Sequence, residues 1–195
     1  MIVFLDTEFT DLVVEPRLLS VGLVAGHSRH REFYAEVTDA DRLHAASWFT
    51  RGAVLPQFGK IAHAACTYAV LGARLGAFLH DLTETLAAGE FAELAFGYHL
   101  DWILVERAVT DSGATNWEST RPRLRPMNVY DLTSFGAGQL ASESYFKTQR
   151  MALFSRHHAL CDARALGLAY AAAITPALEP AQSLPDPRMA PQPAL

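Results

Sequence analysis

An acidic pair near the N-terminus is the first group in this sequence that could do chemistry. Asp6 and Glu8 stand at positions i and i+2, directly after the apolar run at residues 2–5. Residues two apart on a β-strand point to the same face, so the two carboxylates would lie side by side. Each would raise the pKa of the other unless a cation compensates them. Carboxylate oxygens suit Mg²⁺ and Mn²⁺, so the pair predicts a metal site, with a solvated turn as the alternative.

A second acid, Asp101, stands at the start of a predicted helix over residues 100–109, just after a predicted strand over residues 91–96. Asp is a preferred N-cap residue, and capping alone would explain its position. The two interpretations are compatible, because a strand-to-helix junction can also present a carboxylate at the edge of a sheet.

A third segment combines two histidines with an acid. His157 and His158 precede Asp162, which lies one turn into a predicted helix over residues 157–174. Histidine is the usual general base near neutral pH, and it can act on a water bound to a carboxylate-held metal. The alternative is an i,i+4 pair of His158 with Asp162 on a solvated helix face, worth only about 0.2–0.5 kcal/mol.

The elements that must position these residues follow from the apolar pattern. Strands are predicted over residues 2–5, 17–25, 31–37, 91–96 and 127–130, with Asp131 capping the segment after the last of them. A further helix is predicted from residue 68 to about residue 86, because apolar residues recur there at steps of three and four. Residues 39–60 are predicted to mix helix with loop. Short turns between the first three strands are typical of an antiparallel meander. We therefore expect an α/β fold whose mixed sheet joins this meander to parallel strands and is flanked by helices.

Composition limits the class of protein. A chain of 195 residues, 50% of them hydrophobic, suffices for one domain, which we place at residues 1–175. Six of the ten prolines lie in residues 176–195, which predicts a disordered tail. No run of about 18 uncharged apolar residues and no basic leader is present, so we expect a cytoplasmic protein without a membrane partner. Cys66 and Cys161 are interpreted as reduced packing residues.

The formal net charge of −5 disfavours a broad electrostatic grip on long duplex nucleic acid. It does not exclude a nucleic-acid enzyme. If four carboxylates face two divalent cations, much of the acidity belongs to the site itself.

Together and in this order, the three segments resemble the motifs of the DEDD superfamily of exonucleases, over about residues 1–172. Asp101 is placed as in the second motif. Residues 51–56, 99–102 and 126–132 are similar to small stand-alone bacterial exoribonucleases of the ribonuclease T and oligoribonuclease kind. The first motif of the superfamily is Asp-x-Glu followed by Thr-Gly-Leu, and it is resembled by Asp6-Thr7-Glu8-Phe9-Thr10-Asp11-Leu12. The third motif of the histidine subclass (DEDDh) is resembled by His157-x-Ala159-x-x-Asp162-Ala163.

The resemblance implies a ribonuclease-H-like fold and a metal-dependent 3′–5′ exonuclease. It would act on short single-stranded RNA or DNA 3′ ends, with RNA favoured, and release nucleoside 5′-monophosphates. Two divalent cations, Mg²⁺ or Mn²⁺, would serve a two-metal mechanism with His157 as the general base. The implied metal ligands are Asp6, Glu8, Asp101 and Asp162, and the implied substrate-binding residues are Thr7, Phe9, Thr10 and Leu12. Family members are often homodimers, which leaves a homodimer open for this chain.

Two departures from the family pattern bear on substrate preference. Asp11 stands where the family usually has glycine, and it adds a charge near the expected place of the terminal nucleotide. Gly97 stands four residues before Asp101, where the family often has asparagine. The same motifs also fit a DNA-directed proofreading exonuclease, a ribonuclease-H-like domain that binds nucleic acid without cleaving it, or a structural protein in which the acids are helix caps and surface pairs.

The tandem histidines leave the identity of the base open. His157 lies five residues before Asp162, as in the histidine subclass, whereas His158 occupies the place of the tyrosine in the tyrosine subclass. Ala159 and Ala163 fit the histidine pattern, which favours His157.

Overall fold

A six-stranded mixed sheet organises the chain. The computed structural model describes residues 1–26, 31–131, 135–149 and 155–174. The strand order is β4-β3-β2-β1-β5-β6. The first three strands form an antiparallel meander, and each of the others joins its neighbour in parallel. This topology confirms the predicted α/β class and is compatible with a ribonuclease-H-like fold. The strands are β1 (Ile2–Phe9), β2 (Leu18–Ala25), β3 (Arg31–Val37), β4 (Ala65–Cys66), β5 (Ala92–Phe96) and β6 (Leu124–Asn128).

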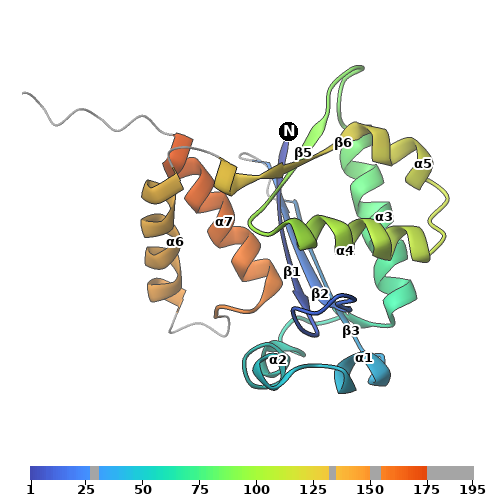
Figure 1. The fold of residues 1–195 in the computed structure, drawn as a ribbon. Helices are drawn as coiled ribbons and strands as arrows, with labels where there is room; N and C mark the ends of the chain where they lie inside the picture. The colour runs from blue at the N-terminus through green and yellow to red at the C-terminus, as the bar shows by residue number, and fades with distance from the viewer. Residues whose placement is uncertain (27–30, 132–134, 150–154, 175–195) are drawn as a thin grey trace, which may run out of the picture.

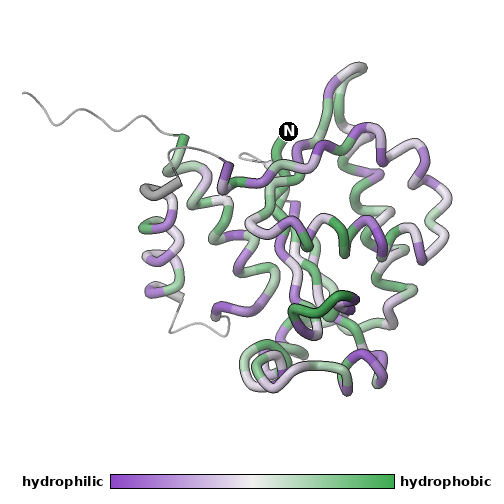
Figure 2. The backbone as a smooth tube through the Cα atoms, viewed as in Figure 1, coloured by the Kyte–Doolittle hydropathy of each residue, from purple (hydrophilic) through white to green (hydrophobic). Residues whose placement is uncertain are grey.

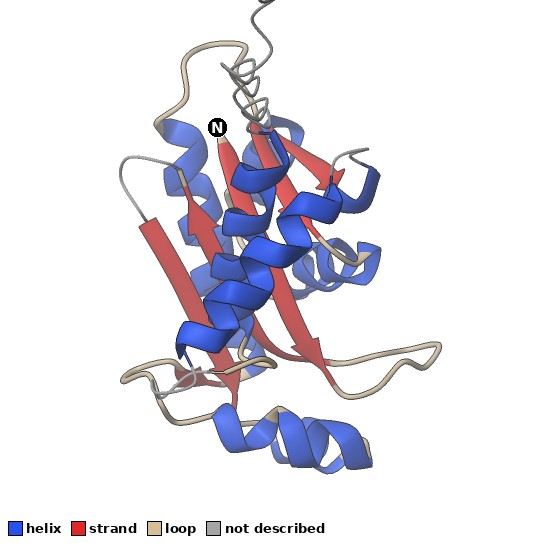
Figure 3. Cartoon of the chain, turned by 90° about the vertical axis from the view of Figure 1, so that its left-hand side faces the viewer, coloured by secondary structure: helices blue, strands red, loops and turns tan. Residues whose placement is uncertain are grey.

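Helices cover both faces of this sheet (Figure 1). On one face lie α3 (Tyr68–Glu84) and α4 (His99–Asp111), and on the other lies α7 (Ala159–Ile174), with α6 (Phe135–Gln149) packed against it. In the view of Figure 3, the pair of helices α6 and α7 lies in front of the strands. Among the described residues, no helix is long and apolar enough to cross a membrane. The shorter elements are α1 (Ala40–His44), α2 (Trp48–Ala53), α5 (Trp117–Thr120) and the 3₁₀ turns η1 (Leu55–Gln57), η2 (Arg121–Arg123) and η3 (Val129–Asp131).

Strand alternation divides the apolar side chains between two cores, and Figure 2 shows the hydrophobic stretches on the strands and on the helices that cover them. Leu5 belongs to the core beneath α3 and α4, whereas Phe4 belongs to the core beneath α7. Burying a side chain of this size contributes about 1.5–3 kcal/mol. Because successive strand residues point to opposite faces, Asp6 and Glu8 lie on the α7 side with Phe4, and Thr7 faces α4.

A glycine in β2 lets α7 approach the strand that carries the acidic pair. Gly22 pairs with Asp6 across the β1–β2 ladder. A Cβ atom on Gly22 would lie 2.3 Å from the backbone nitrogen of Leu160 and 2.5 Å from the carbonyl oxygen of Ala159. These are backbone atoms, so no change of rotamer could relieve the contact. Gly22 therefore brings the first turn of α7, and with it Asp162, next to Asp6.

Substitution of this glycine tests the close approach. We expect Gly22→Ala to lower the free energy of unfolding by about 1–3 kcal/mol, because α7 must move away from the sheet. The matched control is Gly52→Ala in α2, where a Cβ would meet no atom within 4 Å. A helical glycine costs about 0.5–1 kcal/mol relative to alanine, so the control should be neutral or stabilising. Urea unfolding measures both, and equal midpoints for the two variants would contradict the close approach.

Several predicted elements differ from the structure. The first strand continues to Phe9 because β2 pairs along it, so the acidic pair lies within the strand. The last strand is β6, and residues 129–131 form η3 instead. Helix α6 was not predicted, since its sequence has two glycines and widely spaced apolar residues. The start of the segment that Asp131 was expected to cap and the proposed tail at residues 176–195 lie outside the described residues.

Candidate metal and catalytic site

The five residues predicted to do chemistry come from β1, α4, α7 and the segment just before α7, and they meet at one open cavity of about 440 Å³, here called the acid cavity. It lies at the C-terminal ends of β1 and β5, where the parallel register pairs Phe4 with Ala95 and β5 ends one residue later. Ligand sites of open α/β sheets form at the carboxyl ends of parallel strands. The lining includes all five residues predicted to do chemistry, namely Asp6, Glu8, Asp101, His157 and Asp162.

Asp101 ties α4 to β1. Its Oδ1 accepts hydrogen bonds from the hydroxyl of Thr7 at 2.7 Å and from the backbone nitrogen of Thr7 at 3.2 Å. Its Oδ2 accepts from the backbone nitrogen of Tyr98, the N-cap residue, at 3.2 Å. Asp101 thus accepts a hydrogen bond from the backbone N–H of the N-cap residue from a position within the first turn of α4. The N-cap itself is Tyr98, not Asp101. Oδ2 keeps a lone pair for a further partner, whereas both lone pairs of Oδ1 are used.

A hydrogen bond between the backbone of His157 and the side chain of Asp162 holds these two residues together. His157 precedes α7 with a φ of 66°, a left-handed conformation that is uncommon for a residue with a side chain. Its backbone nitrogen donates to Oδ2 of Asp162 at 2.7 Å. The imidazole and the ring of Phe49 pack in a T-shaped arrangement, with 5.0 Å between ring centroids. One ligand atom each from Glu8, His157 and Asp162 lie within 4.8 Å of one another, and these three residues could hold a metal ion.

The structure separates the two histidines. His158 is only 1% exposed and its ring stacks on Tyr34, with centroids 4.4 Å apart. Burial lowers the pKa of His158 to about 4. The alternative of a solvated pair between His158 and Asp162 is therefore excluded. His157, by contrast, lines the acid cavity, which favours His157 over His158 as the candidate base.

The carboxylates of Asp6, Glu8, Asp101 and Asp162, here called the acid centre, are buried and repel one another, so their ionised forms are unfavourable when no cation is bound. Burial raises the pKa of Glu8 to about 8, and the charges of Asp162 and Asp101 add to this. Burial also raises the pKa of Asp162 to about 7 and that of Asp101 to about 6. The pKa of Asp6 is raised well above its usual value by burial and by the other three carboxylates. Carboxylate oxygens that repel one another when ionised are chemically suited to a hard divalent cation.

These pKa shifts predict how stability depends on pH. The raised pKa values of the four carboxylates mean that these groups bind more protons in the folded protein than in the unfolded chain between about pH 4 and about pH 8. The lowered pKa values of His157 and His158 act in the opposite direction below about pH 6.5, but the four carboxylates outnumber the two imidazoles. The free energy of unfolding in EDTA should therefore fall as the pH rises through this window. A cation held by these carboxylates would bind their ionised form, so the stabilising effect expected of Mn²⁺ should grow over the same range. Urea unfolding at several pH values measures both, and metal-free stability that rises from pH 5 to 8 would contradict the pKa shifts.

The residues predicted to bind substrate have different surroundings. Thr7 and Phe9 line the acid cavity, although both polar groups of Thr7 donate to Asp101. Thr10 is buried, and its hydroxyl accepts a hydrogen bond from the backbone nitrogen of Arg17 at 3.1 Å. Leu12 is 70% exposed. A second cavity of about 350 Å³ adjoins the acid centre and is lined by Glu8, Phe9, Asp11, Leu12, Ser47, Phe49, Thr50, Val54 and His157.

Two aromatic residues at the site were not predicted from the sequence. Phe49 forms part of the second cavity and restrains His157, but an aromatic residue in a short helix gives no local signal of such a role. Tyr130 lines the acid cavity beside Gly97, where a Cβ would lie 3.3 Å from Cε2 of its ring. The absence of a side chain at position 97 thus leaves room for the tyrosine. In the sequence, the glycine at position 97, where the family often has asparagine, was the feature that could have indicated this arrangement.

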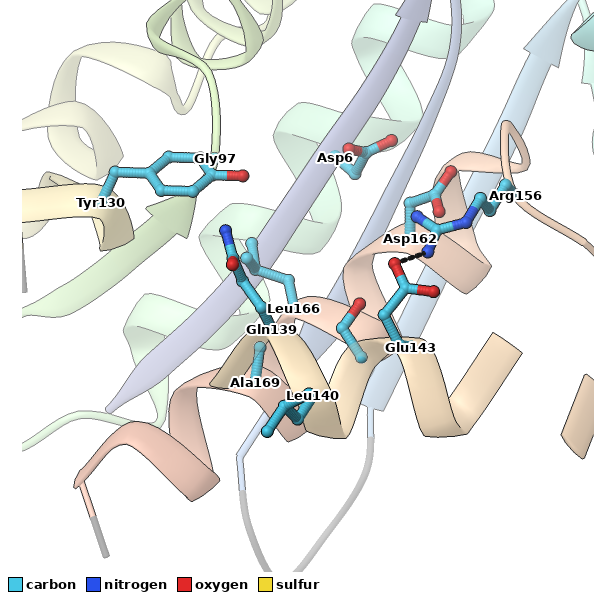
Figure 4. A pocket seen from close by; sticks show the side chains of 11 residues that line it. Asp6, Gly97, Tyr130, Gln139, Leu140, Glu143, Arg156, Asp162, Leu166 and Ala169 are labelled. Atoms are coloured by element: carbon cyan, nitrogen blue, oxygen red, sulfur yellow. Dashed lines mark hydrogen bonds and ion pairs between the residues drawn. The ribbon is translucent and has the colours of Figure 1, made fainter. Parts of the chain in front are cut away.

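A third cavity, of about 490 Å³, adjoins the acid centre on the side of α6 and α7 (Figure 4). Asp6 and Asp162 lie at its inner end, and Tyr130 and Arg156 lie on its walls. The second cavity adjoins Glu8 and His157 instead, and the two cavities share no lining residue. The acid centre therefore lies between them.

Comparison with known proteins does not place this site in a family. No protein-family model matches the chain, and no curated protein matches it. The chemistry open to the chain is therefore inferred from the geometry of its own residues.

Proposed function

We propose that this chain is a metal-dependent 3′–5′ exonuclease of the DEDDh type that hydrolyses single-stranded nucleic acid. The observation that carries this proposal is the meeting of four carboxylates and His157 in one cavity, contributed by segments in the order of the three exonuclease motifs. Such a cluster is repulsive without cations and suited to two of them. A nucleotide can enter on either side of the acid centre, where the second and third cavities lie.

The carboxylates of Asp6, Glu8, Asp101 and Asp162 would hold two divalent cations. When bound, these ions supply Lewis-acid stabilisation of the charge that develops on the phosphate, and they acidify water. Thr7 and the backbone of Tyr98 fix the carboxylate of Asp101 by their hydrogen bonds. The acid centre is thus positioned before any ligand arrives, which lowers the cost of assembling it.

His157 is the proposed general base. Burial and the charge of Arg156 lower the pKa of its imidazole, so the ring is neutral at pH 7 and can accept a proton from an attacking water. Its backbone bond to Asp162 and its contact with Phe49 restrain the ring at the edge of the cavity. Proton transfer by a positioned group of this kind contributes typically about 10²–10⁴-fold to the rate.

The substrate is proposed to be a short single strand, with its 3′-terminal nucleotide in the second cavity. Leu12 and Phe49 give that cavity apolar and aromatic walls, which suit contact with a base regardless of its sequence. The preference for RNA over DNA and the formation of a homodimer follow from the resemblance alone and stay predictions.

Digestion of labelled strands tests the proposed function. Single-stranded RNA labelled at its 5′ end, and its DNA counterpart, are incubated with Mn²⁺, with Mg²⁺ and with EDTA. We expect a ladder that shortens stepwise from the 3′ end with metal and no shortening in EDTA. With a 3′ label, the first product should be the labelled nucleoside 5′-monophosphate. Intact strands under every condition would rule out the exonuclease and favour a binding domain, and faster digestion of DNA would favour a proofreading-type enzyme.

A further inference from the structure

An ion pair lies on the rim of the acid cavity. Arg156, the residue before His157, pairs with Glu143 of α6, and its guanidinium lies 4.3 Å from the centre of the Phe146 ring. Figure 4 shows this pair beside Asp162, with the guanidinium directed toward α6. Arg156 lines both the acid cavity and the third cavity. It thus borders the route by which a strand would leave the acid centre.

The charges around this route make Arg156 distinctive. Among the described residues that line the acid cavity and the third cavity, Arg156 is the one lysine or arginine. The other charged side chains of these linings are carboxylates, which would repel a phosphate that no cation neutralises. Gln139 and Ser142 of α6 add neutral polar groups to the same wall. A phosphate in the third cavity would therefore find its charge partner at Arg156.

We propose that Arg156 binds a phosphate of the bound strand other than the scissile one, and that Glu143 holds the guanidinium until that phosphate replaces it. The inference rests on the proposed function, and it assigns the third cavity to the nucleotide on the 5′ side of the cleaved bond. The planar fork of arginine fits the oxygens of a carboxylate and of a phosphate alike, so Glu143 occupies the place of the phosphate.

The exchange is feasible because the ion pair is exposed. The side chains of Arg156 and Glu143 are 47% and 55% exposed, respectively. Exposed pairs contribute little to stability, and a displaced Glu143 carboxylate can be solvated without any change of fold. Glu143 therefore lowers the affinity for the strand by only a modest factor while it keeps the arginine in position.

The number of phosphates in the substrate distinguishes this role from a structural one. A dinucleotide without terminal phosphates carries only the scissile phosphate, whereas the corresponding trinucleotide carries one more. For cleavage of the 3′-terminal bond, Arg156→Gln should raise the KM of the trinucleotide about tenfold relative to that of the dinucleotide, as expected for the loss of one charge-assisted hydrogen bond. Glu143→Gln should lower the KM of the trinucleotide about two- to fivefold, since it removes the competing carboxylate.

Matched variants separate this local effect from net charge. Arg31→Gln and Asp81→Asn change the charge by the same amounts at an exposed ion pair, 3.8 Å long, between β3 and α3. Neither residue lines the three cavities around the acid centre. These two variants should leave the ratio of the two KM values unchanged. Arg156→Lys keeps the charge without the fork and should fall between wild type and Arg156→Gln.

Salt dependence gives a second readout. Each phosphate contact to a single strand contributes about −0.7 to the slope of log affinity against log salt concentration. For the trinucleotide, the slope of log affinity against log salt concentration should be shallower by about 0.7 in the Arg156→Gln protein than in wild type. The affinity is measured by the anisotropy of a labelled strand in Ca²⁺.

The outcomes distinguish this inference from the proposed function. Hydrolysis of both substrates with KM ratios that neither Arg156→Gln nor Glu143→Gln changes would overturn the role of the pair and leave the exonuclease intact. An equal effect of Arg156→Gln on the dinucleotide would also overturn it, because the arginine would then serve the scissile phosphate. A wild-type protein that hydrolyses neither substrate would overturn the proposed function, and the inference with it.

Discussion

Replacing Asp6 by Asn is expected to reduce hydrolysis by at least about 10³-fold while raising the stability of the metal-free protein. Asp6 lines both the acid cavity and the third cavity, and the other three carboxylates all raise its pKa. An amide at this position removes a ligand that the cations need. It also removes a buried charge that repels its neighbours when no cation is bound. The same substitution should therefore act in opposite directions on activity and on stability.

Rates with Mn²⁺ and urea unfolding in EDTA at pH 8 measure the two effects. Asp81→Asn on α3 is the control, since it removes an exposed carboxylate and should leave the rate nearly unchanged. Addition of Mn²⁺ should raise the urea midpoint of the wild type more than that of Asp6→Asn. If Asp6→Asn lowered stability in EDTA, the repulsion inferred for the acid centre would be incorrect. If it kept wild-type activity, Asp6 would not hold a catalytic metal.

Replacing His157 by Gln is expected to lower kcat by about 10²–10⁴-fold and to leave Mn²⁺ binding nearly unchanged. The pKa of this imidazole is lowered from its ordinary value of 6.5, so the base is neutral above that pH and protonated well below it. The wild-type rate should therefore rise with pH through the acidic range and level off near neutrality. The variant should lose the part of this rise that belongs to the imidazole.

The proximity of His157 to Glu8 and Asp162 allows a second role, because its ring could itself hold the metal. Mn²⁺ affinity separates the two roles: a base leaves it intact, whereas a ligand lowers it together with kcat. His44→Gln on the exposed side of α1 controls for the loss of an imidazole. A large fall in Mn²⁺ affinity of His157→Gln alone would assign His157 to the metal and leave the base unidentified.

The sequence predicted those parts of the fold and the site that depend on local periodicity. Asp6 and Glu8 share a face because strand residues alternate, and this holds whatever packs against the strand. The meander and the mixed sheet followed from apolar runs and turns in the same way. The position of Asp101 at a strand-to-helix junction was also predicted, but its hydrogen bonds to Thr7 depend on how α4 meets β1. No local pattern encodes that contact.

The remaining features arise from contacts between distant segments. Gly22 looks like an ordinary residue of a strand, and its importance appears only where α7 approaches it. Phe49 lies in the short helix α2 and Arg156 in the segment before α7, and neither segment is long enough to show an apolar period. Their contacts with His157 and Glu143 therefore leave no local pattern in the sequence. Helix α6 lacked the apolar stripe that sequence reasoning requires, although it forms one wall of the third cavity. Its position depends on packing against α7, which single-sequence patterns do not report.

The number of Mn²⁺ ions bound per chain tests the central claim most directly. Free Mn²⁺ gives a strong electron paramagnetic resonance signal that is lost on binding, so a titration at pH 8 counts the ions held by wild type and by Asp6→Asn. We expect two ions on the wild-type protein and a loss of binding in the variant, with Asp81→Asn behaving as wild type. No binding by wild type, or equal binding by wild type and Asp6→Asn, would show that the acid centre is not a metal site.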